Sequence, residues 1–125
     1  MINCLEKNRP AAIILTILIA MEIFYFSSIP GGRISSSGIN GITIMYHFIA
    51  FFLFNFFLTI SIIGKKKIKI SYLVFPIIIS IIYAFLDEFH QIFVPFRVAT
   101  IKDILVDGLG ILFSTATYIY SKKNQ

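Results

Sequence analysis

The segment that decides the fold is ITIMYHFIAFFLFNFFLTISII, residues 42–63, which contains no Asp, Glu, Lys or Arg. An α-helix needs about 20 apolar residues to cross the hydrocarbon core of a bilayer, whereas a spanning strand needs only about 10 residues of alternating polarity. The segment has the length for a helix and lacks the alternation of a strand. We therefore expect a transmembrane helix here, because a helix satisfies its own backbone hydrogen bonds in lipid.

Three further apolar runs of similar length flank this segment. They cover residues 11–29, 71–94 and 101–120, and short stretches containing proline, glycine or basic residues separate them. The first run is longer than the apolar core of a typical signal peptide and lacks a small-x-small cleavage site before Pro30, so we interpret it as a helix that is retained. The sequence therefore predicts one all-α domain, residues 1–125, that crosses a membrane four times.

The composition excludes a water-soluble domain. Of the 125 residues, 58% are hydrophobic and 14% are charged, whereas soluble proteins carry about 25% charged residues. A domain of this size buries about 60–70% of the surface of its unfolded chain, which is too little to hide so much apolar surface from water. A bilayer removes that problem.

The basic residues predict the orientation in the membrane. The chain has 11 Lys and Arg and a net charge of +5. Most of these residues lie before the first run, between the second and third runs, and after the fourth: Lys7, Arg9, Lys65, Lys66, Lys67, Lys69, Lys122 and Lys123. Because such clusters stay in the cytoplasm, we expect both termini and the middle connection there, with residues 30–41 and 95–100 as outer loops of a cell-membrane protein. Short clusters between apolar runs do not form a nucleic-acid footprint, so no nucleic-acid partner is expected.

Ionisable residues inside the four runs predict a polar site. Counted from the outer ends of their helices, Glu22, His47, Asp87 and Asp107 all lie about five to seven residues deep, or roughly 7–11 Å. A carboxylate that faces lipid costs at least about 2.5–3.5 kcal/mol, so these groups should face the interior of the bundle. We therefore expect a polar pocket near the outer leaflet.

Helical spacing extends this site to further residues. One face of the third helix carries Tyr83, Asp87, His90 and Gln91, with Glu88 at its edge, and one face of the fourth carries Asp103, Asp107, Gly110, Ser114 and Thr117. From faces and depths, Asp87, His90, Arg97 and Asp103 are expected within side-chain reach of one another.

Structural roles are open for several of these residues. Asp103 can favour the positive end of a helix dipole, Glu88 can face the lipid headgroups, and His47 can bond to a neighbouring carboxylate. Arg97 can form an ion pair with Asp103 or Glu88. Ionisable groups buried in membranes are functional by default, so we interpret the cluster as a whole as a functional site.

The segment YAFLDEFHQIFVP, residues 83–95, followed by Arg97, Asp103 and Gly110, resembles the signature of the VanZ-like family of small membrane proteins. FSSIPG, residues 26–31, resembles the end of the family's first helix, and HF at 47–48 followed by Phe51 resembles its second-helix motif. Three positions depart from the family's pattern. Phe96 replaces a usual Gly, Asp107 stands where Asn is common, and residues 44–46 lack a Lys that often precedes the His.

The resemblance implies which residues form a site, but it does not imply a particular reaction. It matches Asp87, Glu88, His90, Gln91, Arg97 and Asp103 to motif positions. The family's namesake is linked to resistance against teicoplanin, a family-level association that we do not carry over to this chain.

Two classes of function follow. The first is an enzyme or binding protein that acts on an anionic, lipid-linked envelope substrate at the outer leaflet. Its candidate catalytic residues are His90, Asp87, Glu88 and Asp103, and its candidate substrate-binding residues are Arg97, Arg33, Gln91, His47, Glu22 and Asp107. Arg suits bidentate contact with phosphate, His90 or a buried acid would transfer protons, and the other acids would orient it or bind a divalent metal. The sequence names no further cofactor.

The second class is a non-enzymatic envelope or stress factor, or an ion-coupled carrier, whose buried acids lock helices together or take up protons. In both classes the expected partners are membrane lipids, among them phosphate-bearing or lipid-linked ones, and the sequence does not identify a protein partner.

Overall fold

The computed structural model describes residues 2–30, 41–66 and 69–124, with side chains from residue 5 onward. All regular secondary structure in these residues is helical. The helices are α1 (Ile2–Lys7), α2 (Arg9–Ser28), α3 (Gly41–Ile63), α4 (Ile70–Gln91) and α5 (Ile101–Lys123). The four longer helices are long and apolar enough to cross a membrane, so the prediction of a four-span, multi-pass membrane protein is confirmed.

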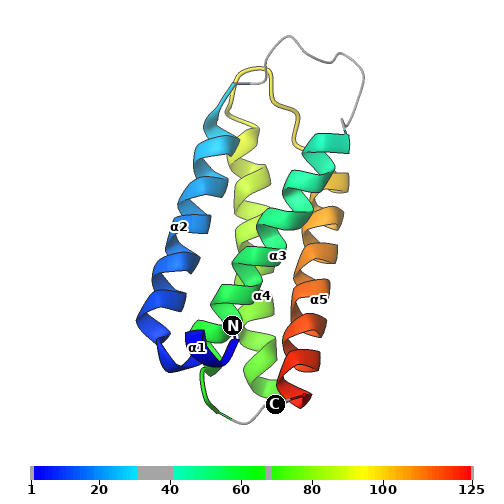
Figure 1. The fold of residues 1–125 in the computed structure, drawn as a ribbon. Helices are drawn as coiled ribbons and strands as arrows, with labels where there is room; N and C mark the ends of the chain where they lie inside the picture. Colours follow the sequence, from blue (N-terminus) through cyan, green and yellow to red (C-terminus); the bar gives the residue numbers. More distant parts are fainter. Residues whose placement is uncertain (1, 31–40, 67–68, 125) are drawn as a thin grey trace.

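The four long helices form an up-and-down bundle in which α3 is the most buried member (Figure 1). Helix α3 packs against both α5 and α2, and its closest association is with α5. Helix α1, the end of α3, the start of α4 and the end of α5 lie at one end, which we call the terminal end (Figure 1). The connection of residues 92–100 lies at the opposite end, which we call the loop end. This arrangement has the even number of crossings that the sequence predicts, whereas the orientation in the membrane stays a prediction.

The bundle is apolar outside and polar inside. Large apolar side chains such as Met21, Phe85 and Leu112 are exposed, as a lipid-facing surface requires. The interior holds many polar groups, all buried: Thr16, Ser27, His47, Asn55, Thr59, Ser80, Asp87, Glu88, Gln91, Asp103, Asp107, Ser114 and Thr115. Polar side chains therefore join the helices from within, because lipid provides no hydrophobic force between helices.

A glycine sets the contact between α3 and α5. A Cβ atom added at Gly110 would lie 2.5 Å from the backbone oxygen of Phe48 and 3.1 Å from the backbone nitrogen of Phe52. Only a residue without a side chain fits this approach. Small residues at helix interfaces are the usual means by which membrane helices come this close.

At the terminal end, a buried acid for which the sequence predicted no role joins α1 to α5. Glu6 on α1 is buried and pairs with Lys122 on α5, and it accepts a hydrogen bond from the hydroxyl of Tyr118 at 3.2 Å. Arg9 of α2 donates to the backbone oxygen of Ser61 on α3 at 2.8 and 3.2 Å. The first two helices are thereby tied to the ends of α3 and α5.

Phe96, in the connection at the loop end, has a φ of 60°. This left-handed conformation costs an L-residue about 1–2 kcal/mol, and glycine adopts it without that penalty. Phe96 is the position where glycine is usual in the family that the sequence resembles. The ring is 87% exposed, so little packing offsets the strain.

Phe96→Gly is therefore expected to raise the free energy of unfolding by about 1 kcal/mol. The measurement is the unfolding midpoint of purified protein in detergent. Val98→Gly, at an exposed position in the same connection without a positive φ, is the matched control and should leave stability unchanged or lower it. Equal effects of the two substitutions would show that Phe96 is not strained.

Candidate functional site

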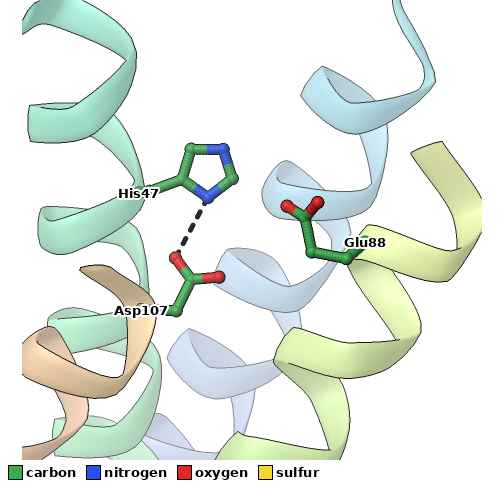
Figure 2. A group of neighbouring side chains, drawn as sticks. All are labelled: His47, Glu88 and Asp107. Carbon is green, nitrogen blue, oxygen red and sulfur yellow. Dashed lines mark hydrogen bonds and ion pairs between the residues drawn. The ribbon is translucent and has the colours of Figure 1, made fainter. Parts of the chain in front are cut away.

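Three buried side chains from three helices converge near the loop end (Figure 2). His47 comes from α3, Glu88 from α4 and Asp107 from α5, and we call them the trio. One nitrogen or carboxylate oxygen from each lies within 4.8 Å of the others. Nδ1 of His47 lies 3.0 Å from Oδ1 of Asp107. The other oxygen of Asp107, Oδ2, is buried and has no hydrogen-bond partner among the described residues.

Residues at the start of α5 bond to one another and to Glu88 of the trio. The Thr100 hydroxyl donates to Asp103 at 2.7 Å and accepts from the Asp103 backbone N–H at 3.2 Å, which caps the helix. The backbone N–H of Thr100 donates to Oε2 of Glu88 at 3.0 Å. Asp103 thus lies in the first turn of α5 and bonds to the residue that caps this helix, and Thr100 also holds the Glu88 carboxylate.

A second polar group lies between α4 and α2. Asp87 accepts hydrogen bonds from the hydroxyl of Ser27 at 2.5 Å and from Nε2 of Gln91 at 3.0 Å. His90 lies 3.0 Å from the hydroxyl of Ser28. Gln91 also donates to Oε1 of Glu88 at 3.5 Å, so it connects this group to the trio.

Arg97 contacts backbone rather than carboxylates. Its Nη2 donates to the carbonyl of Phe26 at 2.6 Å and its Nε to that of Ile29 at 3.1 Å. These carbonyls belong to the end of α2, where backbone acceptors lack helical partners. Within the described residues, Arg97 has no ion pair with Asp103 or Glu88. Arg33, its predicted companion, lies outside the described residues.

A cavity of about 360 Å³ opens beside the trio. Its lining comes from α2, α3, α4 and the loop-end connection, and most of the surface exposed to it is apolar. Seven of the nine lining residues nevertheless carry a polar or ionisable group, and only Phe26 and Ile42 do not. The nine are Glu22, Phe26, Ser27, Ile42, Thr43, Tyr46, His47, Gln91 and Arg97. The hydroxyl of Tyr46 is buried and has no partner among the described residues. His47 belongs to both the cavity lining and the trio.

An apolar groove of about 530 Å³ reaches the trio from another side, between α4 and α5. Its walls include Phe85, Phe89 and Ile104, and Glu88 is part of its lining. The trio therefore lies between the cavity that His47 lines and a groove on the lipid-facing surface.

The structure distributes the predicted site residues over distinct places. Glu22 is exposed on α2 at the cavity, and Gln91, His47 and Arg97 also line it. Asp87 and His90 bond to serines of α2, while Asp103 lies in the first turn of α5 and bonds to Thr100, the residue that caps this helix. The sequence did not single out Tyr46, Ser27 or Thr100. Tyr46 was detectable as a polar neighbour of His47, whereas the partners of serine and threonine hydroxyls depend on how the helices are rotated.

This arrangement permits two kinds of chemistry. A carboxylate on one ring nitrogen of a histidine orients the ring and leaves the other nitrogen free to take a proton, as Asp107 does for His47. Alternatively, an imidazole and two carboxylates are a donor set for a divalent cation. Both use the same residues, beside a cavity large enough for a polar headgroup.

Comparison with known proteins identifies the family. The model of the VanZ/LLP1 family matches residues 12–122, which include α3, α4, nearly all of α2 and α5, and every residue of the cavity and the trio. No curated protein and no solved structure matches the chain. The match covers most of the sequence in one piece, and the chain therefore belongs to the VanZ/LLP1 family.

Proposed function

We propose that this chain is a cell-membrane protein that binds the phosphate-bearing headgroup of a lipid, or of a lipid-linked envelope substrate, in the cavity at the loop end. The observation that carries the proposal is the cavity itself. It is a hollow whose lining residues include Glu22, His47 and Arg97, within a bundle whose outer surface is largely apolar. Polar and ionisable groups inside membranes line the paths or sites of polar ligands.

Two side chains provide the main donors. Arg97 brings a guanidinium to the cavity, and its contacts with the carbonyls of Phe26 and Ile29 hold it in place. Arg recognises phosphate through its planar set of N–H groups. Tyr46 adds a buried hydroxyl that lacks a partner among the described residues, and a phosphate oxygen would satisfy it.

Other lining residues suit the rest of a headgroup. Glu22 and Thr43 can bond to hydroxyl or amino groups that accompany the phosphate. The basic clusters of the chain lie at the terminal end, and basic clusters stay in the cytoplasm. The loop end would then face outward, and the ligand would come from the outer leaflet.

Tyr46→Phe and Arg97→Gln are each expected to weaken binding of phosphate-bearing lipid by about tenfold or more, since a hydrogen bond to a charged group contributes about 1.5–3 kcal/mol. Arg97→Lys should also bind less well, because Lys lacks the planar donor set. The measurement is binding of short-chain phosphatidic acid and of a polyprenyl phosphate to purified protein. Inorganic phosphate and diacylglycerol show whether the headgroup alone or the lipid alone is enough.

Lys102→Gln is the matched control. It removes the same charge near the loop end, from an exposed residue outside the cavity lining, and should leave binding unchanged. Thermal unfolding of each variant separates binding from the contact of Arg97 with α2. If Tyr46→Phe binds as well as wild type and Arg97→Gln changes only stability, the cavity is not a phosphate site.

A further inference from the structure

All three side chains of the trio are buried, as the ligands of a bound ion inside a protein commonly are. The exposed fractions of His47, Glu88 and Asp107 are 4%, 4% and 0%. Each residue comes from a different helix, so three separate packing contacts bring the side chains together (Figure 2). Isolated charges are excluded from such an interior unless they are paired or coordinate a metal.

Oδ2 of Asp107 is the second, independent observation. It is a fully buried carboxylate oxygen without a hydrogen-bond partner among the described residues. Nδ1 of the His47 ring lies 3.0 Å from the other oxygen, Oδ1. In Figure 2 the free oxygen lies on the side of Asp107 that faces Glu88. A cation between the two carboxylates would satisfy this oxygen, and a divalent one would cancel both negative charges.

We propose that His47, Glu88 and Asp107 bind one divalent metal ion, for which Zn²⁺ and Mn²⁺ are the best-suited probes. Imidazole favours Zn²⁺ and related transition metals, and carboxylates favour Mn²⁺ as well, while the absence of a thiolate from the trio disfavours Cu(I). Two atoms bound to one metal at about 2.0–2.2 Å lie roughly 3 Å apart. Nδ1 of His47 and Oδ1 of Asp107 have this spacing, at 3.0 Å, and the ligand atoms of all three residues lie within 4.8 Å of one another, so the Glu88 carboxylate would close on the bound ion.

The surroundings complete the site. The backbone N–H of Thr100 and the amide of Gln91 hold the Glu88 carboxylate, as outer partners hold metal ligands in known sites. Three protein ligands leave coordination positions for water or for an oxygen of a bound molecule. Because His47 also lines the cavity, these positions would be reached from there.

This inference goes beyond the proposed function, because metal binding is measured without lipid and either can fail alone. Full-length protein in detergent, freed of its affinity tag and of metal, is titrated with Zn²⁺ in a calorimeter and with Mn²⁺ by electron paramagnetic resonance. Wild type should bind one ion per chain. His47→Gln, Glu88→Gln and Asp107→Asn should each lower the affinity at least about tenfold, since even loss of an outer partner costs about 10–100-fold.

Glu6→Gln is the control, since it alters a buried carboxylate that pairs with Lys122 at the terminal end. It should bind the ion as wild type does. Saturating Zn²⁺ should raise the thermal midpoint of wild type and of Glu6→Gln but not of the trio variants. If a variant does not fold, the titration of wild type still tests whether the chain binds one ion. Absence of a one-to-one ion in wild type, or unchanged binding in the folded trio variants, would overturn the proposal.

Discussion

Gly110→Ala is expected to destabilise the bundle by about 3 kcal/mol, the upper end of the range for overpacking. The added methyl would lie 2.5 Å from the carbonyl oxygen of Phe48, a backbone atom that no side-chain rotation can move. Helices α3 and α5 would have to separate, and His47 and Asp107 bond across this same interface. The measurement is unfolding by sodium dodecyl sulfate of protein in mild detergent, followed by circular dichroism.

Gly108→Ala tests the same substitution two residues earlier on α5. A Cβ at Gly108 would have nothing within 4 Å, so this variant should keep or slightly raise stability through its better helix propensity. A similar loss in both variants would point to a general need for flexibility in α5. A loss confined to Gly110 would identify the close approach of the helices as its cause.

Asn55→Leu is expected to lower the free energy of unfolding by about 1–3 kcal/mol. Asn55 is fully buried in the middle of α3, and its amide nitrogen lies 3.1–3.2 Å from Ile111 O, Ser114 Oγ and Thr115 Oγ1 on α5. Its amide oxygen accepts from the hydroxyl of Ser80 on α4 at 3.1 Å. Leucine keeps the approximate volume, so the loss would come from the unpaired hydroxyls.

Thr117→Ala is the control for removal of a polar group from a transmembrane helix. The Thr117 hydroxyl bonds only within its own helix, to the carbonyl of Phe113 at 2.8 Å, and the residue is exposed. Unfolding in dodecyl sulfate should therefore be nearly unchanged. If Asn55→Leu behaves in the same way, the buried amide does not join the three helices.

The sequence was sufficient for the helices because their signal is local. Segments of about 20 apolar residues must be helical in lipid whatever surrounds them. Helix α1 was not predicted, since it is short and its place depends on the pairing of Glu6 with Lys122, which are far apart in the sequence. Helix α4, the third predicted span, ends at Gln91 and not at residue 94 as predicted. Tight turns begin there, in which the backbone N–H groups of Phe93 and Val94 bond to the carbonyls of His90 and Gln91.

The sequence predicted which residues contribute to the candidate site, but not which of them contact one another. The shared depth of His47, Asp87 and Asp107 followed from counting residues along each helix. Which of them meet depends on how each helix is rotated about its axis, and Gly110 sets that contact for α3 and α5. His90 shares a helix face with Asp87 in the sequence, yet it bonds to Ser28 while His47 meets Asp107.

The distribution of polar partners also bears on how the protein is assembled in the membrane. Helix α5 is the least apolar of the four long helices and supplies the partners of Glu6, His47 and Asn55. It leaves the ribosome after the others, so until it is inserted helix α3 exposes the imidazole of His47 and the amide of Asn55 to the interior of the bilayer without their partners. The nascent bundle would therefore be a substrate for membrane insertion factors and quality-control proteases, and completion of α5 would release it from both.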